Sequence, residues 1–419
     1  MPLRPSKRSQ EFWGNGTMRI IVLSPFLYYP GVPNGGGALC WGQLQALADD
    51  NEVHFLSFVR PNGYELAVAK PHLLLVCKSI TTVVQKIGRL DVLRSKVKLA
   101  VQRVPDVASL CHSTEMQAAL RELIAKVQPD LVMIQFPQMA QYVAECAGTP
   151  TLMDVQDAFS VSAYRRYQAV QGFAKKALAL LTWVAWIKYE AKWYRKFSVT
   201  TALTNQDAAG LEIFTPGLAP TVSKAAVSIP AARWAPTNEQ TIAFIGSYAH
   251  LPNVDAVTFF VQKVLPLVLA ELPDAVFVVA GKGATPEMQA LAGKNVRLIG
   301  TVPESNAFLA SAAVVVVPLL SGGGIKIKTL EALASGCPVV STSIGVEETG
   351  AVSGTHLLVA DSPKVFAQHV ITLLTNAELA QQIGTNARTL AHDQFSWSAK
   401  RLSLATQIEL AVKRQRSSL

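Results

Sequence analysis

Cysteine is scarce in this chain of 419 residues. There are five cysteines, they are widely spaced, and no two of them form a CxxC pair. Neither a disulfide framework nor a structural zinc site is therefore expected, and a reducing compartment fits the composition. The seven histidines are scattered and show no metalloprotease spacing, so we expect no metal site.

Long apolar runs are also missing. The longest run of membrane-like composition, Ala177–Ile187, falls well short of the ~20 residues that a spanning helix needs. The N-terminus is basic, but no apolar signal core follows it, so no secretory peptide is predicted. We expect a cytoplasmic protein that is either soluble or peripheral at the inner face of the membrane.

Charged residues make up only 16% of the chain and hydrophobic residues 50%, which excludes wholesale disorder. The length suggests two domains. The net charge of +9 lies in one half, with 25 Lys and Arg against 16 Asp and Glu through residue 235, and 13 against 13 afterwards. Such one-sided basicity suggests that a single domain meets an anionic partner.

Short apolar strands alternate with helical segments in both halves. Arg19–Ser24 is the first predicted strand, and a loop containing Gly35–Gly37 follows it. The pattern restarts at Thr241–Ile245, after a polar, proline-containing linker at Ala231–Gln240. The sequence therefore predicts an α/β protein with two Rossmann-like domains, whose parallel sheets face an interdomain cleft.

The most informative segment runs from Val317 to Val340. A buried strand leads into three consecutive glycines and then into a predicted helix, Ile325–Ser335. Glycines allow close approach to a ligand, and free N–H groups at a helix start favour a diphosphate. Lys326 would lie in the first turn, where a cation is unfavourable unless an anion lies nearby. Glu331 could accept both hydroxyls of a ribose; the alternative is an ordinary turn with a surface Lys–Glu pair.

These pieces together resemble the retaining GT-B glycosyltransferases of family 4, also called glycosyl transferases group 1. The resemblance covers most of the chain and is tightest from Ile242 to Val340. The matching pieces are Phe244-Ile-Gly246-Ser with Pro252-Asn253, Val278-Val-Ala-Gly281-Lys-Gly283, Gly300-Thr-Val-Pro-Glu304, the glycine–lysine–glutamate segment, and Phe395-Ser-Trp397.

The resemblance implies a role for each matching position. It implies that Glu331 holds the nucleotide ribose, that Lys326 contacts phosphate, and that the backbone at Val302 reads the nucleobase. The other implied donor-site residues are Gly36, Gly37, Gly246, Gly322, Gly323, Gly324 and Lys328. It also implies an acceptor domain at residues 18–230, a nucleotide-sugar domain at 236–395, and a last helix at 396–419 that packs back on the first domain.

Two positions depart from the family pattern. Gly323 stands where the family has the first glutamate of its pair, and Gln156-Asp157 stands where many members have a histidine. We interpret the glycine-rich, lysine-bearing segment as a coherent alternative design. Stabilising the leaving diphosphate is the main chemical requirement, which favours front-face substitution. Asp157 is the candidate for orienting acceptor or sugar, and it could equally be a helix N-cap.

Basic residues concentrate in Arg165–Lys196, which holds eight of them against Glu190, with Trp183, Trp186 and Trp193 interleaved. Such a segment fits contact with an anionic membrane surface, and a core helix with solvated lysines fits equally. No nucleic-acid partner is expected, because no known binding module accompanies the charge.

The sequence therefore predicts a metal-independent hexosyltransferase without a cofactor. Its donor would be a UDP- or GDP-linked sugar, and its acceptor a glycan or lipid-linked molecule in polysaccharide or glycoconjugate biosynthesis. A catalytically weak nucleotide-sugar-binding subunit of an envelope polysaccharide assembly is the alternative. A nicotinamide dehydrogenase is a third class, and Gly281–Gly283 lacks the complete fingerprint it would need.

Overall fold

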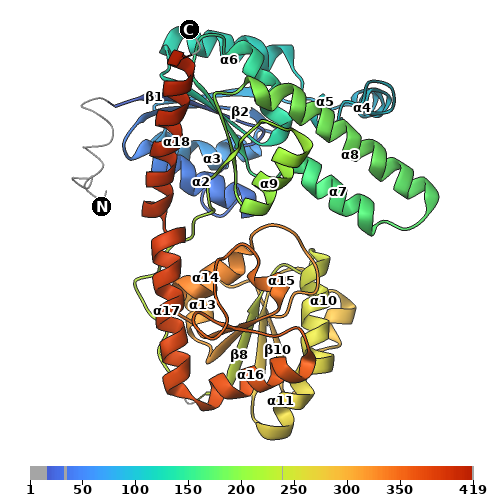
Figure 1. Ribbon diagram of the computed structural model, residues 1–419, viewed down its shortest axis with the longest axis vertical. Coiled ribbons are helices and arrows are strands. Elements are labelled where there is room, and N and C mark those ends of the chain that lie inside the picture. Colours follow the sequence, from blue (N-terminus) through green and yellow to red (C-terminus); the bar gives the residue numbers. More distant parts are fainter. Residues whose placement is uncertain (1–16, 33–34, 238, 418–419) are drawn as a thin grey trace. The chain divides into compact units, whose positions relative to one another are not determined.

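A computed structural model describes residues 17–32, 35–237 and 239–417. Contacts divide the chain into two compact units. Unit 1 is Met1–Lys224 with Lys400–Leu419, and unit 2 is Ala225–Ala399. The first unit thus ends before residue 230, and the segment expected as a linker, Ala231–Gln240, belongs to unit 2. Figure 1 shows that each unit has a central sheet with helices around it.

Unit 1 has a seven-stranded parallel sheet in the order β3-β2-β1-β4-β5-β6-β7. The strands are β1 (Arg19–Ser24), β2 (Glu52–Val59), β3 (Ser79–Val84), β4 (Leu131–Gln135), β5 (Thr151–Val155), β6 (Val199–Ala202) and β7 (Thr221–Val222). The helices are α2 (Gly35–Ala48), α3 (Tyr64–Val76), α4 (Arg89–Gln102), α5 (Asp106–Leu110), α6 (Thr114–Val127), α7 (Phe159–Ala169), α8 (Phe173–Trp193), α9 (Asn205–Phe214) and α18 (Trp397–Ser417), with 3₁₀ turns at η1 (Pro137–Glu145) and η2 (Tyr194–Lys196).

Both faces of this sheet are buried, as continuous apolar strands require. Along β1, Ile20 and Val22 join one hydrophobic cluster, and Ile21 and Leu23 join the other. Helix α18 covers the first of these clusters with Leu404, Ile408 and Ala411, so the last helix of the chain is part of the core of unit 1.

Unit 2 has a six-stranded parallel sheet in the order β10-β9-β8-β11-β12-β13. The strands are β8 (Thr241–Ile245), β9 (Val276–Ala280), β10 (Val296–Gly300), β11 (Val314–Val317), β12 (Val339–Ser341) and β13 (Leu358–Val359). The helices are α10 (Leu251–Phe259), α11 (Leu265–Glu271), α12 (Pro286–Gln289), α13 (Ser305–Ala310), α14 (Ile327–Ser335), α15 (Ser343–Val346), α16 (Pro363–Thr375) and α17 (Ala377–Phe395), with a π-helical turn η3 (Phe260–Val264) joining α10 to α11.

One helical stretch in the described residues, Leu251–Glu271, is long and apolar enough to cross a membrane by length and composition alone. One side of it lies in the core of unit 2, where Phe260, Val264 and Val268 are fully buried. A core helix passes the same test, so this stretch is weak evidence for a membrane span.

Candidate functional site

The two sheets share a strand order that reverses direction at one point. In unit 2 the reversal lies between β8 and β11, which run side by side and parallel. In open α/β sheets, ligands bind beyond the carboxyl ends of the strands at such a point. Gly246 directly follows β8, and residues 318–326 follow β11. The structure therefore places the predicted donor-site residues of these two segments at the switch point of unit 2.

Lys328, on the first turn of α14, reaches the backbone just beyond β8. Its ammonium donates a hydrogen bond to the side-chain oxygen of Asn253 and lies 4.5 Å from the centroid of the Phe244 ring. A Cβ atom on Gly246 would come within 2.8 Å of both the Lys328 nitrogen and the Asn253 side chain. Glycine at position 246 therefore makes room for this lysine.

Burial shifts the titration of Lys328 and of its neighbour Glu331 toward neutrality. Removal from water lowers the pKa of Lys328 to about 8, and the Glu331 carboxylate opposes that shift. Removal from water also raises the pKa of Glu331 to about 7, with Lys328 opposing it. The Glu331 carboxylate accepts no hydrogen bond from the residues that the structure describes. A desolvated cation and a carboxylate open to a donor thus lie together beside the strand ends.

Lys326 has a different environment from the predicted one. Helix α14 begins at Ile327, so Lys326 precedes the first turn. Its ammonium folds back to donate to the carbonyls of Gly324 at 2.7 Å and Gly322 at 3.4 Å, and it pairs with Glu347 at 3.1 Å. The side chain is 6% exposed. In this structure Lys326 holds the shape of the glycine loop, and Lys328 is the lysine beside Gly246.

The glycine loop needs its glycines for conformational reasons. Gly322 and Gly324 have φ angles of 123° and 67°, a region that side chains disfavour. Gly323 is not among the described residues that have a positive φ angle. A left-handed backbone therefore requires glycine at positions 322 and 324 and not at position 323.

Val302 lies two residues beyond β10, half-buried, on the same edge of the sheet. Backbone hydrogen bonds align the strand ends that separate it from Gly246. The Gly246 N–H donates to Ala280 at 2.9 Å, and the Gly281 N–H donates to Gly300 at 2.7 Å. Val302 is therefore two strands away from Gly246 along this edge of the sheet.

Gly36 and Gly37 lie within the first turn of α2, since that helix begins at Gly35. The prediction of a glycine loop at Gly35–Gly37 was therefore wrong. A first turn accepts glycine because those N–H groups need no partner four residues back. The residues remain at a helix N-terminus beyond β1, where the dipole favours an anion.

Asp157 lies just beyond β5. It accepts a hydrogen bond from the Ser162 hydroxyl at 2.8 Å, and Ala158 occupies the N-cap position of α7 with no side-chain cap. The alternative that Asp157 caps this helix is therefore wrong. Desolvation raises the pKa of Asp157, and the hydrogen bond from Ser162 and the charge of Arg165 oppose this shift with smaller effects.

Unit 1 also contains a buried carboxylate that was not predicted from the sequence. Asp154, the fourth residue of β5, is 1% exposed. Its carboxylate accepts from Gln43 at 2.9 Å, Gln135 at 2.9 Å and Gln156 at 2.7 Å. Those glutamines come from α2, β4 and the segment after β5, so the network ties α2 to the strand ends. The signal was an acidic residue inside an apolar strand.

The basic segment Arg165–Lys196 contains the end of α7 and the whole of α8. These two helices form a hairpin that projects from the sheet of its own unit (Figure 1). Its tryptophans do not form an outward-facing belt. Trp183 packs against Tyr164 and Tyr167, and Trp186 packs against Phe159. At the hairpin tip, Phe173 is 93% exposed. The aromatic side chains are thus largely internal, whereas the bases remain outside.

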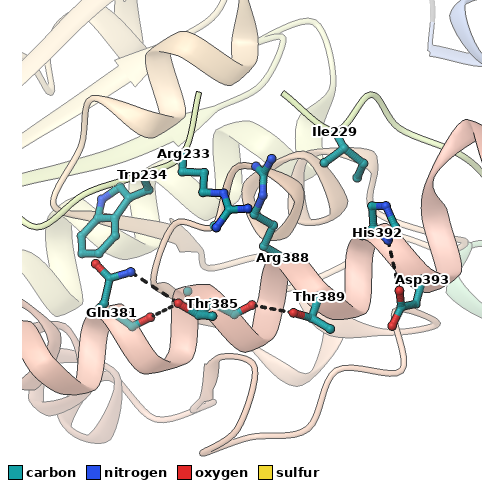
Figure 2. Close-up of a pocket in the computed structure, with 11 residues that line it drawn as sticks. Ile229, Arg233, Trp234, Gln381, Thr385, Arg388, Thr389, His392 and Asp393 are labelled. Carbon is teal, nitrogen blue, oxygen red and sulfur yellow. Dashed lines mark hydrogen bonds and ion pairs between the residues drawn. The ribbon is translucent and has the colours of Figure 1, made fainter. Parts of the chain in front are cut away.

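A cavity of about 320 Å³ in unit 2 lies away from the switch point. It is lined by Gly336, at the far end of α14 from the glycine loop, and by residues of α17. Figure 2 shows Arg233 and Arg388 pointing toward one another there. Arg388 donates to the carbonyls of Ala334 at 2.8 Å and Pro230 at 2.5 Å, so it fastens the first segment of unit 2 to α14.

In the part of the chain that the structure describes, no three His, Cys, Asp or Glu side chains are grouped so that they could hold a metal ion. All five cysteines are free and buried. Burial raises the pKa of Cys337 and of the other four, which leaves them unreactive.

Two comparisons of sequence find similar proteins. Residues 239–376 match the family described as Glycosyl transferases group 1. The chain is also 30% identical over 164 residues to an "uncharacterized 44.6 kDa protein in cps region" of Klebsiella pneumoniae. That alignment covers 37% of this chain and 42% of the relative's length. The family match contains Gly246, the glycine loop, Lys328 and Glu331.

Solved GT-B structures match nearly the whole chain. HepE of Anabaena, in complex with UDP and glucose, is 13% identical with a TM-score of 0.62, covering 94% of this chain and 99% of HepE. Staphylococcus aureus TarM, in complex with UDP and two sugar compounds, is 12% identical with a TM-score of 0.64, covering 94% and 100%. Sucrose-phosphate synthase of Thermosynechococcus elongatus is 15% identical with a TM-score of 0.66, covering 96% and 99%.

The fold is therefore GT-B, as predicted. Within that fold, the match to glycosyl transferases group 1 covers residues 239–376, which lie in unit 2.

Proposed function

We propose that the protein is a retaining glycosyltransferase that moves a hexose from a UDP- or GDP-linked sugar to a glycan or lipid-linked acceptor. The observation that carries the proposal is the meeting of Gly246, Lys328 and Glu331 with the glycine loop at the switch point of unit 2. HepE and TarM bind UDP in their solved structures. The relative in a cps region supports a place in polysaccharide or glycoconjugate biosynthesis.

Each part of the site has a role in the proposed reaction. Glu331 accepts the ribose hydroxyls, and the backbone at Val302 contacts the base. The backbone at Gly322–Gly324, with the start of α14, stabilises the charge that develops on the leaving diphosphate. Lys328 adds a desolvated positive charge at the strand ends. Lys326 positions the loop, and its ammonium lies 2.7 Å from the Gly324 carbonyl.

Unit 1 supplies the acceptor side in this proposal. Gly36 and Gly37 lie at the start of α2, where the helix dipole favours an anion, and we assign them to the donor diphosphate. Asp157 orients the acceptor hydroxyl, which attacks the sugar from the same face as the leaving phosphate. That phosphate takes the proton of the hydroxyl. No metal or cofactor is required, because lysine and helix-terminal amides supply the positive potential.

We also propose that the protein is cytoplasmic and peripheral, with the bases of Arg165–Lys196 facing an anionic membrane surface. The exposed tip of the α7–α8 hairpin supports this location, with Lys175 and Lys176 beside Phe173. A catalytically weak nucleotide-sugar-binding subunit remains the second candidate, and Gly323 favours it because the first glutamate of the family is missing. Turnover separates the two, since a binding subunit retains nucleotide without releasing UDP or GDP.

A panel of nucleotide sugars tests the donor by thermal shift. The matched donor at about 100 times its dissociation constant is expected to stabilise the protein by about 2.7 kcal/mol. Release of free UDP or GDP in the presence of acceptor glycans then tests transfer. If no nucleotide sugar in the panel raises the melting temperature, the proposed function is wrong.

Nucleotide affinity is expected to fall as pH rises through about 8. The protonated form of Lys328 binds the diphosphate. Above the lowered pKa of the free protein, which is about 8, binding must take up a proton. Affinity then falls by up to about tenfold per pH unit. Calorimetry in two buffers of different ionisation enthalpy measures that proton uptake. The Lys328→Met variant corrects for ionisation of the nucleotide itself, and equal uptake in both proteins would contradict the assignment.

A further inference from the structure

Unit 1 contains a second cavity of about 320 Å³, between α4, α5 and α8. Four of its lining residues are cationic: Lys98, Arg103, Lys188 and Lys192. No carboxylate is among the residues that line it. Two of these cations, Lys188 and Lys192, are one helical turn apart on α8 and belong to the basic segment Arg165–Lys196.

The four cations lack a counterion among the residues that the structure describes. None of their side chains makes an ion pair or a hydrogen bond with the part of the chain that the structure describes, and Lys192 lies 4.7 Å from the centroid of the Trp193 ring. Like charges around one cavity repel each other, which disfavours the charged forms and the compact arrangement. An anion in the cavity would reverse the sign of this interaction.

Neutral polar groups complete the cavity wall. Ser109, His112 and Gln141 line it together with the cations. The Gln141 amide nitrogen donates to the Ala108 carbonyl at 2.9 Å, and its oxygen lies 3.2 Å from the His112 ring nitrogen Nδ1. The second ring nitrogen of His112 has no partner among the described residues. The Ser109 hydroxyl therefore supplies a neutral hydrogen-bond donor beside the charge, as phosphate oxygens require.

The helix that carries Lys98 also exposes an apolar stripe. Leu90, Leu93, Val97 and Val101 are 66%, 62%, 54% and 74% exposed. They are three or four residues apart and lie on one face of α4, while Ser95 and Leu99 on the opposite face are buried. Arg89, Arg94, Lys96 and Lys98 are basic neighbours of this stripe. An apolar stripe with flanking bases is the pattern of a helix that lies in a membrane interface.

We propose that this cavity binds the phosphate or diphosphate headgroup of a lipid, while the stripe on α4 lies in the apolar edge of the same bilayer. The cavity supplies recognition of phosphate, and the stripe supplies the apolar contact that a soluble phosphate would not use. The inference rests on the proposed function only for the role of that lipid as acceptor. Binding itself is measured without any nucleotide sugar, so the two can fail separately.

The test compares two kinds of phosphatidylcholine vesicle with the full chain. One contains phosphatidic acid and the other oleate, adjusted to equal surface potential. The wild-type chain is expected to prefer phosphatidic acid, and the variant Lys98→Gln/Lys192→Gln to lose that preference. The expected loss of affinity for the phosphatidic acid vesicles is about 30-fold, the equivalent of ~1 kcal/mol for each basic residue near a charged surface. Val97→Ser/Val101→Ser is expected to weaken binding to both kinds of vesicle.

Lys175→Gln/Lys176→Gln is the matched control, because it removes the same charge from the exposed end of the same helix. It is expected to weaken binding to both vesicles and to keep the preference for phosphatidic acid. Equal binding of the wild-type chain to both vesicles would overturn the proposal. So would an unchanged preference after Lys98→Gln/Lys192→Gln, or calorimetric binding of free pyrophosphate without binding to vesicles.

Discussion

Replacing Glu331 with glutamine is expected to lower nucleotide-sugar turnover on the order of 100-fold. In the proposed site this carboxylate accepts both ribose hydroxyls, and hydrogen bonds to a charged group contribute about 1.5–3 kcal/mol each. Glutamine keeps the size of the side chain but offers one acceptor and no charge. The variant also leaves Lys328 without the carboxylate that opposes its loss of a proton, so the diphosphate contact weakens at the same time.

The measurement is release of UDP or GDP from the donor found by thermal shift. Glu287→Gln is the control, since Glu287 is exposed on α12 of the same unit. Removing the buried charge of Glu331 is not expected to lower the melting temperature, because burial already disfavours the ionised form. A loss of turnover therefore reports on the site rather than on folding. Turnover equal to that of wild type would remove Glu331 from the site.

Much of the sheet framework could be predicted from the sequence, because its central strands are continuous apolar runs between breakers. The strands Arg19–Ser24 and Thr241–Ile245 have the predicted bounds. The edge strand Ser79–Val84 was not predicted. It is only half-buried, with two threonines at its centre, so its pattern resembles that of a loop. A strand that is buried on both faces can be recognised in the sequence, because it is a continuous apolar run.

The candidate site was predicted in composition and only partly in geometry. Spacing placed a lysine close to the glycine loop, but it could not say which of Lys326 and Lys328 would fold back onto the loop. That outcome depends on Glu347, 21 residues farther along the chain, and on the space that Gly246 leaves. The cavity beside α4 could not be predicted either, because its cations come from α4 and its C-cap and from α8, about 90 residues farther along the chain.

Replacing Gly281 with alanine is expected to unfold unit 2 at a temperature about 6–12 °C lower than wild type. A Cβ atom at this position would lie 2.1 Å from the carbonyl oxygen of Gly246 and 3.1 Å from the Tyr248 ring. The backbone cannot move aside, because Gly246 and Gly281 are each held by an N–H bond to the next strand. Overpacking against fixed backbone costs about 3 kcal/mol, and about 1 kcal/mol shifts the melting temperature of a unit this size by about 2–4 °C.

Gly293→Ala provides the comparison, since a Cβ atom there would meet nothing within 4 Å and its φ is not positive in the structure. Its melting temperature is expected to stay close to that of wild type, so a shift confined to Gly281→Ala isolates the clash from the general effect of losing a glycine. The same clash pushes on Gly246, where an added Cβ atom would lie 2.8 Å from the Lys328 nitrogen. Nucleotide affinity measured below the melting transition should therefore fall in Gly281→Ala and not in Gly293→Ala. Equal affinity in the two variants would mean that the strand ends and Lys328 do not form one binding surface.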